Sequence, residues 1–295
     1  MILLLGAAVW LLIENGNNWL QQIEDFEWQP DWFFLVVSSL ILWISYFLTP
    51  LGWIWLSHHA GSTVNAKDLA SAWFISQLGR YMPGKIWLFV GRVGFLKSSG
   101  LSTFKATSVP FLEVLFTVAA AGLAATVPII LTESISFGDS GLRTVILAAG
   151  VCVLIIPLLT PIQRWLYKLK YGTIPDTLAL PGVKGSLKLL MLYSGLWWLR
   201  GLTLFLWLKG FGVQSIDFWI CCAAAPLSWL AGYIVFLSPG GIGIREAAAV
   251  AIVAPSGVTG PVLAVIAGQR VLLSIAEVFF ALISTGKAKI FRRER

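Results

Sequence analysis

Long apolar runs separated by short polar stretches recur along the whole chain. The hydrocarbon core of a bilayer is about 30 Å thick and takes about 20 apolar residues per helix, a length that the runs reach repeatedly. Strands of a membrane barrel would alternate over about ten residues, whereas 33–56 and 261–285 are apolar on every side. The pattern predicts an all-α polytopic membrane protein. We place its spans at about 1–20, 32–57, 104–131, 142–163, 188–209, 217–238 and 261–285.

The first span differs from the others because Met1 begins directly in apolar sequence and Glu14 follows early. An uncleaved anchor and a signal-like segment both fit this pattern. No small-x-small cleavage motif precedes the next span, so we keep 1–20 as a helix.

Two further apolar segments, at about 71–96 and 240–255, are broken by proline and glycine and carry charges. Irregular backbone at membrane depth is tolerated only where it is buried in protein or lines a wet cavity. We therefore expect two re-entrant elements here, with the functional centre between them.

The charge distribution predicts the orientation of the spans. No Lys or Arg precedes Lys67 and the first loop is acidic, so this loop is expected outside. The basic stretches at 80–105 and 164–188 and the basic tail 287–295 are expected in the cytoplasm. Seven spans would put the tail outside, whereas an eighth crossing at 240–255 returns it to the cytoplasm. We favour eight spans, in the plasma membrane of a prokaryotic cell.

The two halves of the chain resemble each other. Each has a Pro-Gly pair, then a short polar turn with a glycine, then a span with a charged residue 13 positions after that glycine. The corresponding residues are Pro83 and Pro239, Gly100 and Gly257, and Glu113 and Arg270. Chance is the alternative to duplication, but many transporters place a substrate site between related halves. We predict one transmembrane domain, 1–295, with repeat halves of about 1–137 and 138–295.

The composition indicates which surroundings and partners the chain is suited to. Of 295 residues, 58% are apolar and only 12% are charged, which is too few charges for a water-facing surface. The net charge of +7 is spread over loops without an Arg-rich or aromatic recognition element, so anionic lipid headgroups are expected as partners and nucleic acid is not. The 15 tryptophans are expected chiefly in interfacial belts. The cysteines, expected as small core residues, are Cys152, Cys221 and Cys222.

The first broken element reads Gly-Arg-Tyr-Met-Pro-Gly-Lys from Gly79, and Arg92 follows it. Proline removes a hydrogen-bond donor and glycine allows positive φ, so a helix must stop here and leave backbone groups unpaired. Basic side chains beside such a stop can hold a lipid phosphate; ordinary snorkelling of positive charge is the alternative. The candidate residues are Arg80, Pro83, Gly84, Lys85 and Arg92.

The second broken element runs from Ser238 to Glu246 and leads into an Ala-rich segment. Its glycines could let backbone N–H groups converge on an anion at a helix N-terminus. A structural role is the rival interpretation, in which the two charged residues pair with each other or with partners elsewhere. The candidate residues are Gly240, Gly241, Gly243, Arg245 and Glu246.

Four ionisable residues lie inside predicted spans, where such residues are rare and are functional hypotheses by default. They are Glu113, Arg200, Arg270 and Glu277. Arg270 and Glu277 are seven positions apart and hence share a helix face. A buried ion-pair network and the lining of a pathway are equally compatible with this pattern.

Catalytic signatures are missing from the sequence. It has no H-E-x-x-H, no G-x-S-x-G, no Walker motif and no close acidic pair for metal and sugar-nucleotide binding. We therefore expect no enzyme activity, no metal and no cofactor.

The two broken elements resemble, in the same order, the hallmark stretches of the lysylphosphatidylglycerol synthase transmembrane-region family, and the resemblance covers essentially the whole chain. The residues that match its pattern are Pro83, Gly84, Arg92, Pro239, Gly240, Gly241, Gly243 and Glu246, and less distinctively Glu113 and Arg270. This family includes the flippase half of the multiple peptide resistance factor. The resemblance implies that the chain moves a lipid between leaflets. The aminoacyl-transferase domain of the fused members has no counterpart in the sequence, so lipid synthesis is not implied.

The main hypothesis is a lipid flippase or scramblase that moves a phospholipid or lipid-linked headgroup through a polar cavity between the broken elements. The alternative is a membrane-embedded accessory protein or transferase acting on lipid-linked sugars, and a third hypothesis is a structural scaffold. A homo-oligomer or a partner lipid-modifying enzyme is compatible with each of them.

Overall fold

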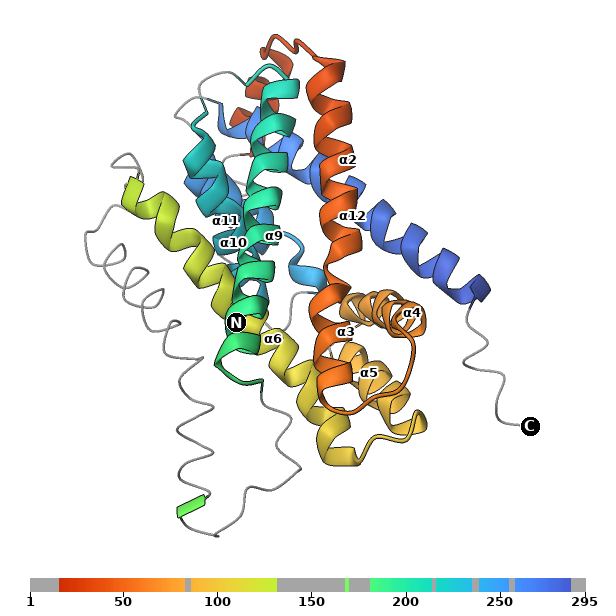
Figure 1. The fold of residues 1–295 in the computed structure, drawn as a ribbon. Coiled ribbons are helices and arrows are strands. Elements are labelled where there is room, and N and C mark those ends of the chain that lie inside the picture. The colour runs from red at the N-terminus through yellow and green to blue at the C-terminus, as the bar shows by residue number, and fades with distance from the viewer. Residues whose placement is uncertain are drawn as a thin grey trace.

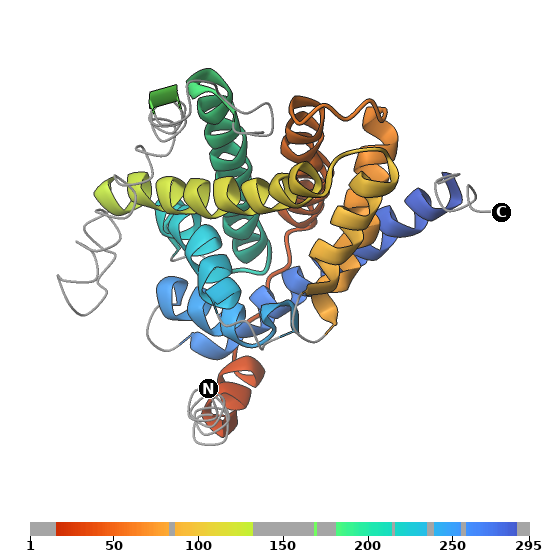
Figure 2. The ribbon, with the colours of Figure 1, turned by 90° about the horizontal axis from the view of Figure 1, so that it is seen from below.

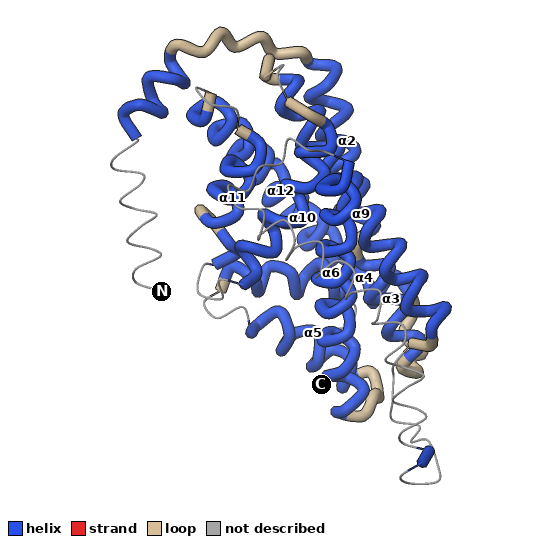
Figure 3. The backbone as a smooth tube through the Cα atoms, turned by 90° about the vertical axis from the view of Figure 1, so that its left-hand side faces the viewer, coloured by secondary structure: helices blue, strands red, loops and turns tan. Residues whose placement is uncertain are grey.

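The computed structural model describes residues 16–82, 86–131, 168–169, 181–213, 216–234, 239–254 and 258–287. All regular elements within these ranges are helices (Figure 3). The predicted span 142–163 and most of 1–20 lie outside the described residues, as does Cys152.

Four helical stretches of the described chain are long and apolar enough to cross a bilayer. They are Trp32–His59, Thr103–Leu131, Val183–Gly210 and Thr259–Thr285. These stretches coincide with four of the predicted spans, and the predicted span 217–238 corresponds to the shorter apolar helix Phe218–Ile234. The structure therefore confirms the all-helical membrane class, while the total of seven or eight spans stays a prediction.

The first long stretch comprises two helices, α2 (Trp32–Leu48) and α3 (Pro50–His59). Asp31 begins α2 because its carboxylate accepts a hydrogen bond from the N–H of Phe33 at 2.9 Å, which satisfies one of the free donors of the first turn. Pro50 is the first residue of α3, a position where the missing N–H costs nothing.

The helix α9 (Val183–Gly210) lies in the middle of the bundle. It packs against α2, α6 (Thr103–Leu131) and α10 (Phe218–Ile234). In Figure 1, α2 and α9 stand side by side, while α6 and α12 (Thr259–Lys287) are strongly tilted. Seen from below, α6 runs across the molecule beside α9 and α10 (Figure 2).

Each broken segment combines a 3₁₀ turn with one or two short helices. The first contains α4 (Ala66–Gln77), the 3₁₀ turn η1 (Leu78–Tyr81) and α5 (Ile86–Ser98). The second contains the 3₁₀ turn η2 (Pro239–Gly241) and α11 (Ile244–Val253), and α10 precedes it as the predicted span 217–238. The two turns η1 and η2 contact each other, and α12 packs against α4, η1 and α11. The turns η1 and η2, one from each broken segment, therefore meet against one long helix.

Small residues allow close helix contacts in the core. A Cβ atom at Gly201 would lie 2.5 Å from the Cα atom of Cys222, so α9 and α10 approach as closely as membrane helices commonly do at glycine. Cys221 and Cys222 are buried and free, as predicted.

Large apolar side chains cover the outside of the bundle. Phe33, Met191 and Leu282 are 71%, 76% and 64% exposed. Soluble proteins rarely present contiguous surfaces of this kind, so these outward faces are suited to contact with lipid tails.

Candidate functional site

Two adjoining cavities of about 110 and 180 Å³ lie at the centre of the bundle. Both are lined by Arg200, Trp229, Arg245 and Leu273, so these residues stand at the boundary between them. The smaller cavity extends towards α11, and the larger one extends towards α4, α5 and η1.

The lining is rich in charge. It contains five arginines and three glutamates, which are Arg80, Arg92, Arg200, Arg245, Arg270, Glu113, Glu246 and Glu277. Every one of these residues was singled out in the sequence. The structure brings them together from α5, α6, α9, α11, α12 and η1.

The Arg92–Glu113 pair joins α5 to α6 and is fully buried, with Arg92 1% exposed and Glu113 4%. Trp73 Nε1 donates to the second oxygen of Glu113 at 2.6 Å, and Arg92 Nε donates to Ser76 Oγ at 3.0 Å. The Arg92 guanidinium also lies 5.3 and 5.2 Å from the ring centres of Trp53 and Trp73. Arg92 is therefore occupied by protein partners, which neither of its two expected roles, a lipid-phosphate contact or snorkelling, included.

The Arg80–Glu277 pair ties η1 to α12. Arg80 Nη1 lies 2.9 Å from Glu277 Oε1, and the Tyr81 hydroxyl donates to Glu277 Oε2 at 2.6 Å. Arg80 also donates to the side-chain oxygen of Gln77 at 2.6 Å, and Ser274 lies 3.2 Å from the Tyr81 hydroxyl. Glu277 is thus a buried acceptor for two neighbouring residues of the first broken element.

Arg270 ties η2 and α11 to the same helix. Its Nη2 atom donates to the backbone oxygen of Gly240 at 2.7 Å, and its Nε atom lies 3.8 Å from Glu246 Oε1. At 3.8 Å, Arg270 and Glu246 form an ion pair that is too long for a hydrogen bond. Arg270 and Glu277, predicted to share a face of α12, therefore each hold one of the two broken elements.

The glycines of the second element adopt the conformation that the sequence indicates. Gly240, Gly241 and Gly243 have φ values of +63°, +76° and +85°, a region that side chains with a Cβ rarely adopt. The N–H of Gly243 donates to Glu246 Oε2 at 2.6 Å. The chain's own carboxylate therefore takes the Gly243 donor, one of the N–H groups that the sequence offered to an anion.

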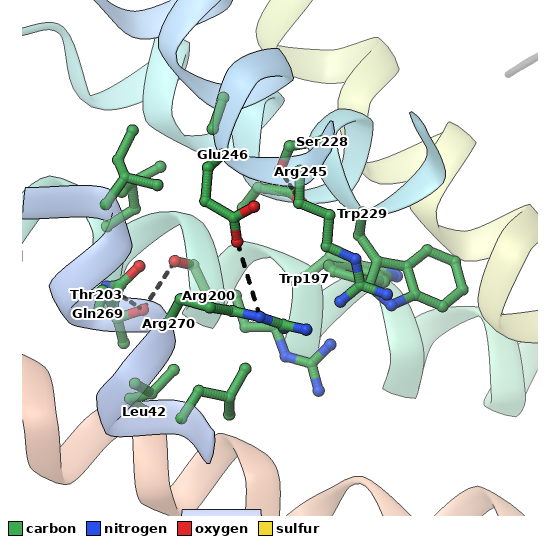
Figure 4. Close-up of a pocket in the computed structure, with 15 residues that line it drawn as sticks. Leu42, Trp197, Arg200, Thr203, Ser228, Trp229, Arg245, Glu246, Gln269 and Arg270 are labelled. Carbon is green, nitrogen blue, oxygen red and sulfur yellow. Dashed lines mark hydrogen bonds and ion pairs between the residues drawn. The ribbon is translucent and has the colours of Figure 1, made fainter. Parts of the chain in front are cut away.

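Arg200 and Arg245 are held by aromatic rings. The Arg200 guanidinium lies 4.7 Å from the centre of Trp197, and that of Arg245 lies 5.8 Å from the centre of Trp229. Arg200 Nη2 donates to Thr49 Oγ1 at 3.1 Å. Neither arginine has a carboxylate partner among the described residues. Of the two alternatives left open for these charges, pairing with each other or with partners elsewhere, the structure shows the second for Glu246, which faces Arg270. Figure 4 shows the side chains of Arg200, Arg245 and Arg270 directed into the same space.

A third cavity, of about 810 Å³, is an apolar groove on the outer side of α12. Its wall includes Val271, Ile275 and Leu282, which are at least half exposed. Glu246 and Arg270 line this groove and the smaller polar cavity alike. One loose ion pair therefore separates an apolar, outward-facing groove from the charged centre of the bundle.

Three candidate residues of the first broken element, Pro83, Gly84 and Lys85, lie outside the described residues. Other residues of the site could not be found from the sequence. The missed residues are aromatic: Trp53, Trp73 and Trp197 are 0%, 2% and 3% exposed and contact arginines. These three rings pack inside the protein against arginines, a role that the expectation of interfacial belts did not include. An isolated tryptophan in an apolar run carries no signal of what its ring faces.

Comparison with family models identifies the family of the chain. The family model described as the lysylphosphatidylglycerol synthase TM region covers residues 1–280. No curated protein matches the sequence. The match extends over both broken elements and all eight charged residues of the cavities, and it confirms the family suggested by the sequence motifs. The chain belongs to the lysylphosphatidylglycerol synthase TM region family of membrane proteins.

Proposed function

We propose that this protein is a flippase- or scramblase-type transporter that moves a phospholipid or lipid-linked headgroup between the two leaflets. The observation that carries the proposal is the shared wall of groove and cavity. Glu246 and Arg270 line an apolar groove on one side and a charged cavity on the other. A lipid is the ligand that needs both environments at once.

The chemistry of the two compartments matches the two parts of a lipid. Arginine presents a planar fork of donors that fits phosphate oxygens, and several arginines line the polar cavities. The groove offers apolar side chains and lies open on the outer face of α12, where acyl chains can remain in hydrocarbon. On this proposal the headgroup crosses through the cavities while the tails stay in the bilayer.

The contact between Glu246 and Arg270 is suited to act as the gate. At 3.8 Å the pair lacks a hydrogen bond, and its side chains are 11% and 15% exposed. A phosphate arriving from the groove offers Arg270 a stronger, bidentate partner than Glu246 does. Opening the gate would also release the hydrogen bond from Arg270 to Gly240 and thereby move η2.

An internal duplication is part of the proposal. In each half a turn and a short helix precede a helix of 29 residues, α6 or α12. In the first half the short helix α5 supplies an arginine and the long helix a glutamate, as Arg92–Glu113. In the second half the signs are exchanged, as Glu246–Arg270. This correspondence supports two related halves with re-entrant elements that meet at the cavities.

The proposal treats the chain as a transporter and not as an enzyme, with eight spans in a prokaryotic plasma membrane. Liposome reconstitution tests it. The full chain is reconstituted with fluorescently labelled phosphatidylglycerol, phosphatidylcholine or lysyl-phosphatidylglycerol, and an impermeant quencher reports which leaflet holds the label. We expect quenching of inner-leaflet label for at least one lipid and none in protein-free liposomes.

If protein that is monodisperse on gel filtration moves no lipid, the transport proposal is rejected. A lipid-modifying enzyme that co-purifies with such inactive protein would favour the accessory or transferase alternative. If lipid moves but Arg80→Ala and Arg245→Ala leave the rate unchanged, the function stands and the assignment of the site is wrong. Lys209→Gln, on α9 but outside the cavities, is the matched control and is expected to retain the rate.

A further inference from the structure

The charge of the two polar cavities is unbalanced within the described residues. Arg80, Arg92 and Arg270 each face one glutamate. Arg200 and Arg245 line both cavities and face no carboxylate in the described part of the chain. The described lining therefore carries two positive charges in excess.

The two excess charges flank a pair of touching indole rings. Arg200 lies on Trp197 and Arg245 on Trp229, and the centres of the two rings are 5.1 Å apart. A cation over an aromatic ring is oriented by the ring, but its net charge is not neutralised. The four side chains thus form a prearranged cationic site at the boundary of the cavities.

Glycines confine Arg245 to this position. A Cβ atom at Gly241 would lie 2.6 Å from Arg245 Nε, and one at Gly232 would collide with Arg245 Cγ. The side chain therefore fills the space that a larger residue at either position would take. Its Nε atom has no hydrogen-bond partner, and the same holds for Nε of Arg200.

Neighbouring charges make the arrangement unfavourable without a ligand. Arg80 and Arg270 lie near enough to repel both Arg200 and Arg245, while Glu277 attracts both and Glu246 attracts Arg245. Both Glu277 and Glu246 already face another arginine, so they do not remove the excess. Uncompensated charge at membrane depth is costly and is normally paired. A bound ligand with two negative charges would remove this imbalance, whereas a ligand with one would leave half of it.

We infer that Arg200 and Arg245 bind a dianionic phosphate group, namely a phosphomonoester or a diphosphate. The inference rests on the proposed function and names its substrate class as a lipid that ends in such a group. A phosphodiester headgroup such as that of phosphatidylglycerol carries a single negative charge. A lysyl-bearing headgroup has a net positive charge and fits this site least.

Binding of short-chain lipids tests the inference. The full chain in neutral detergent is titrated by calorimetry with dioctanoyl phosphatidic acid, dioctanoyl phosphatidylglycerol and the lysyl form of the latter. We expect phosphatidic acid to bind about ten-fold or more tightly than phosphatidylglycerol, and the lysyl lipid to bind most weakly. The double variant Arg200→Gln/Arg245→Gln should lose the preference, and Lys209→Gln should keep it.

Two checks separate binding from folding. The double variant should melt at or above the temperature of the unaltered protein, because it removes two charges that repel their neighbours. The charge-preserving Arg245→Lys variant should retain a measurable preference for phosphatidic acid. Equal affinity for the two phospholipids, or an unchanged preference in a folded double variant, would overturn the inference.

The source of the phosphate is resolved by competition with inorganic pyrophosphate. A site for a lipid headgroup should hold phosphatidic acid against equimolar pyrophosphate, whereas a site for a soluble dianion should release it. The two proposals can fail separately. Movement of phosphatidylglycerol without preferential phosphatidic acid binding leaves the transport function and removes the dianion site. Preferential binding of phosphatidic acid without movement of any lipid leaves the dianion site and removes the transport function.

Discussion

At the scale of single residues, the arginines of the cavities differ in what holds them. Arg92 is enclosed by Glu113, Ser76 and two tryptophans and is 1% exposed. Arg245 rests on one ring and has no carboxylate beside it among the described residues. Loss of the first should therefore damage the fold, whereas loss of the second should affect the ligand.

The Arg92→Gln substitution should destabilise the protein strongly, because it leaves the buried Glu113 carboxylate without its counter-charge. Breaking a buried pair in this way costs about 3–5 kcal/mol. The double variant Arg92→Gln/Glu113→Gln should recover a large part of this loss, since neither charge remains. Thermal unfolding in detergent measures each corner of this double-mutant cycle. A double variant as unstable as the sum of the two single variants would contradict the pairing.

At the scale of elements, α12 organises the site through two residues on one face. Glu277 accepts hydrogen bonds from Arg80 and Tyr81 of η1, and Arg270 donates to Gly240 of η2. A helix that holds both breaks can couple a change at one of them to the other.

Glu277→Gln should loosen η1 selectively. The neutral amide cannot balance Arg80 and accepts more weakly from Tyr81, so the first broken element loses its anchor. Hydrogen exchange of peptides that cover 78–98 should accelerate several-fold, while exchange over 244–253 should change little. Ser284→Ala, on the same helix, is the control because that hydroxyl donates to the backbone oxygen of Phe280, four residues earlier in α12 itself. Uniform acceleration throughout the protein would indicate global destabilisation instead.

The stability of the turn into α11 should depend on the backbone conformation of Gly243 and not on the space around it. Gly243 has φ +85° and open space around its Cα, so Gly243→Ala meets no atom but must adopt a left-handed conformation. The expected cost is about 1–2 kcal/mol. Gly195→Ala is the matched control, because Gly195 lies inside α9 with equally open surroundings and ordinary helical backbone. Equal unfolding temperatures for the two variants would argue against strain at Gly243.

At the scale of the whole molecule, the bundle combines a lipid-facing exterior, a charged centre and one groove between them. Large apolar side chains point outward on α2, α9 and α12. The groove along α12 meets the charged centre at Glu246 and Arg270. Transport on the proposed route therefore depends on open space in the groove.

Ala267→Trp should block this route without unfolding the protein. Ala267 lines the groove, and an indole there would fill part of its 810 Å³ while remaining in an apolar environment. We expect the rate of lipid movement in liposomes to fall at least ten-fold, with an unfolding temperature close to that of the unaltered chain. Met191→Trp is the control, because Met191 is 76% exposed on α9 and lines none of the three cavities. Equal rates for both variants would exclude the groove as the route.

Much of the fold could be predicted from the sequence, since the length of an apolar run is a local property. The predicted spans 32–57, 104–131, 188–209 and 261–285 coincide with helices within a few residues. The break at η2 was also readable, because consecutive glycines after a proline permit little else than an irregular turn. The charged residues of the site stood out for the same reason, as ionisable groups are rare in apolar spans.

The sequence by itself determined the helical membrane class, the family and the residues that carry charge at depth. Only the tertiary structure decided how these charges are partnered. Arg80 meets Glu277 across 197 positions, Glu246 faces Arg270 and not its neighbour Arg245, and Arg245 lies on Trp229. The physical reason is that the length of an apolar run and the backbone freedom of glycine are properties of neighbouring residues in the sequence. The pairing of charges depends instead on which helix faces meet in the packed bundle.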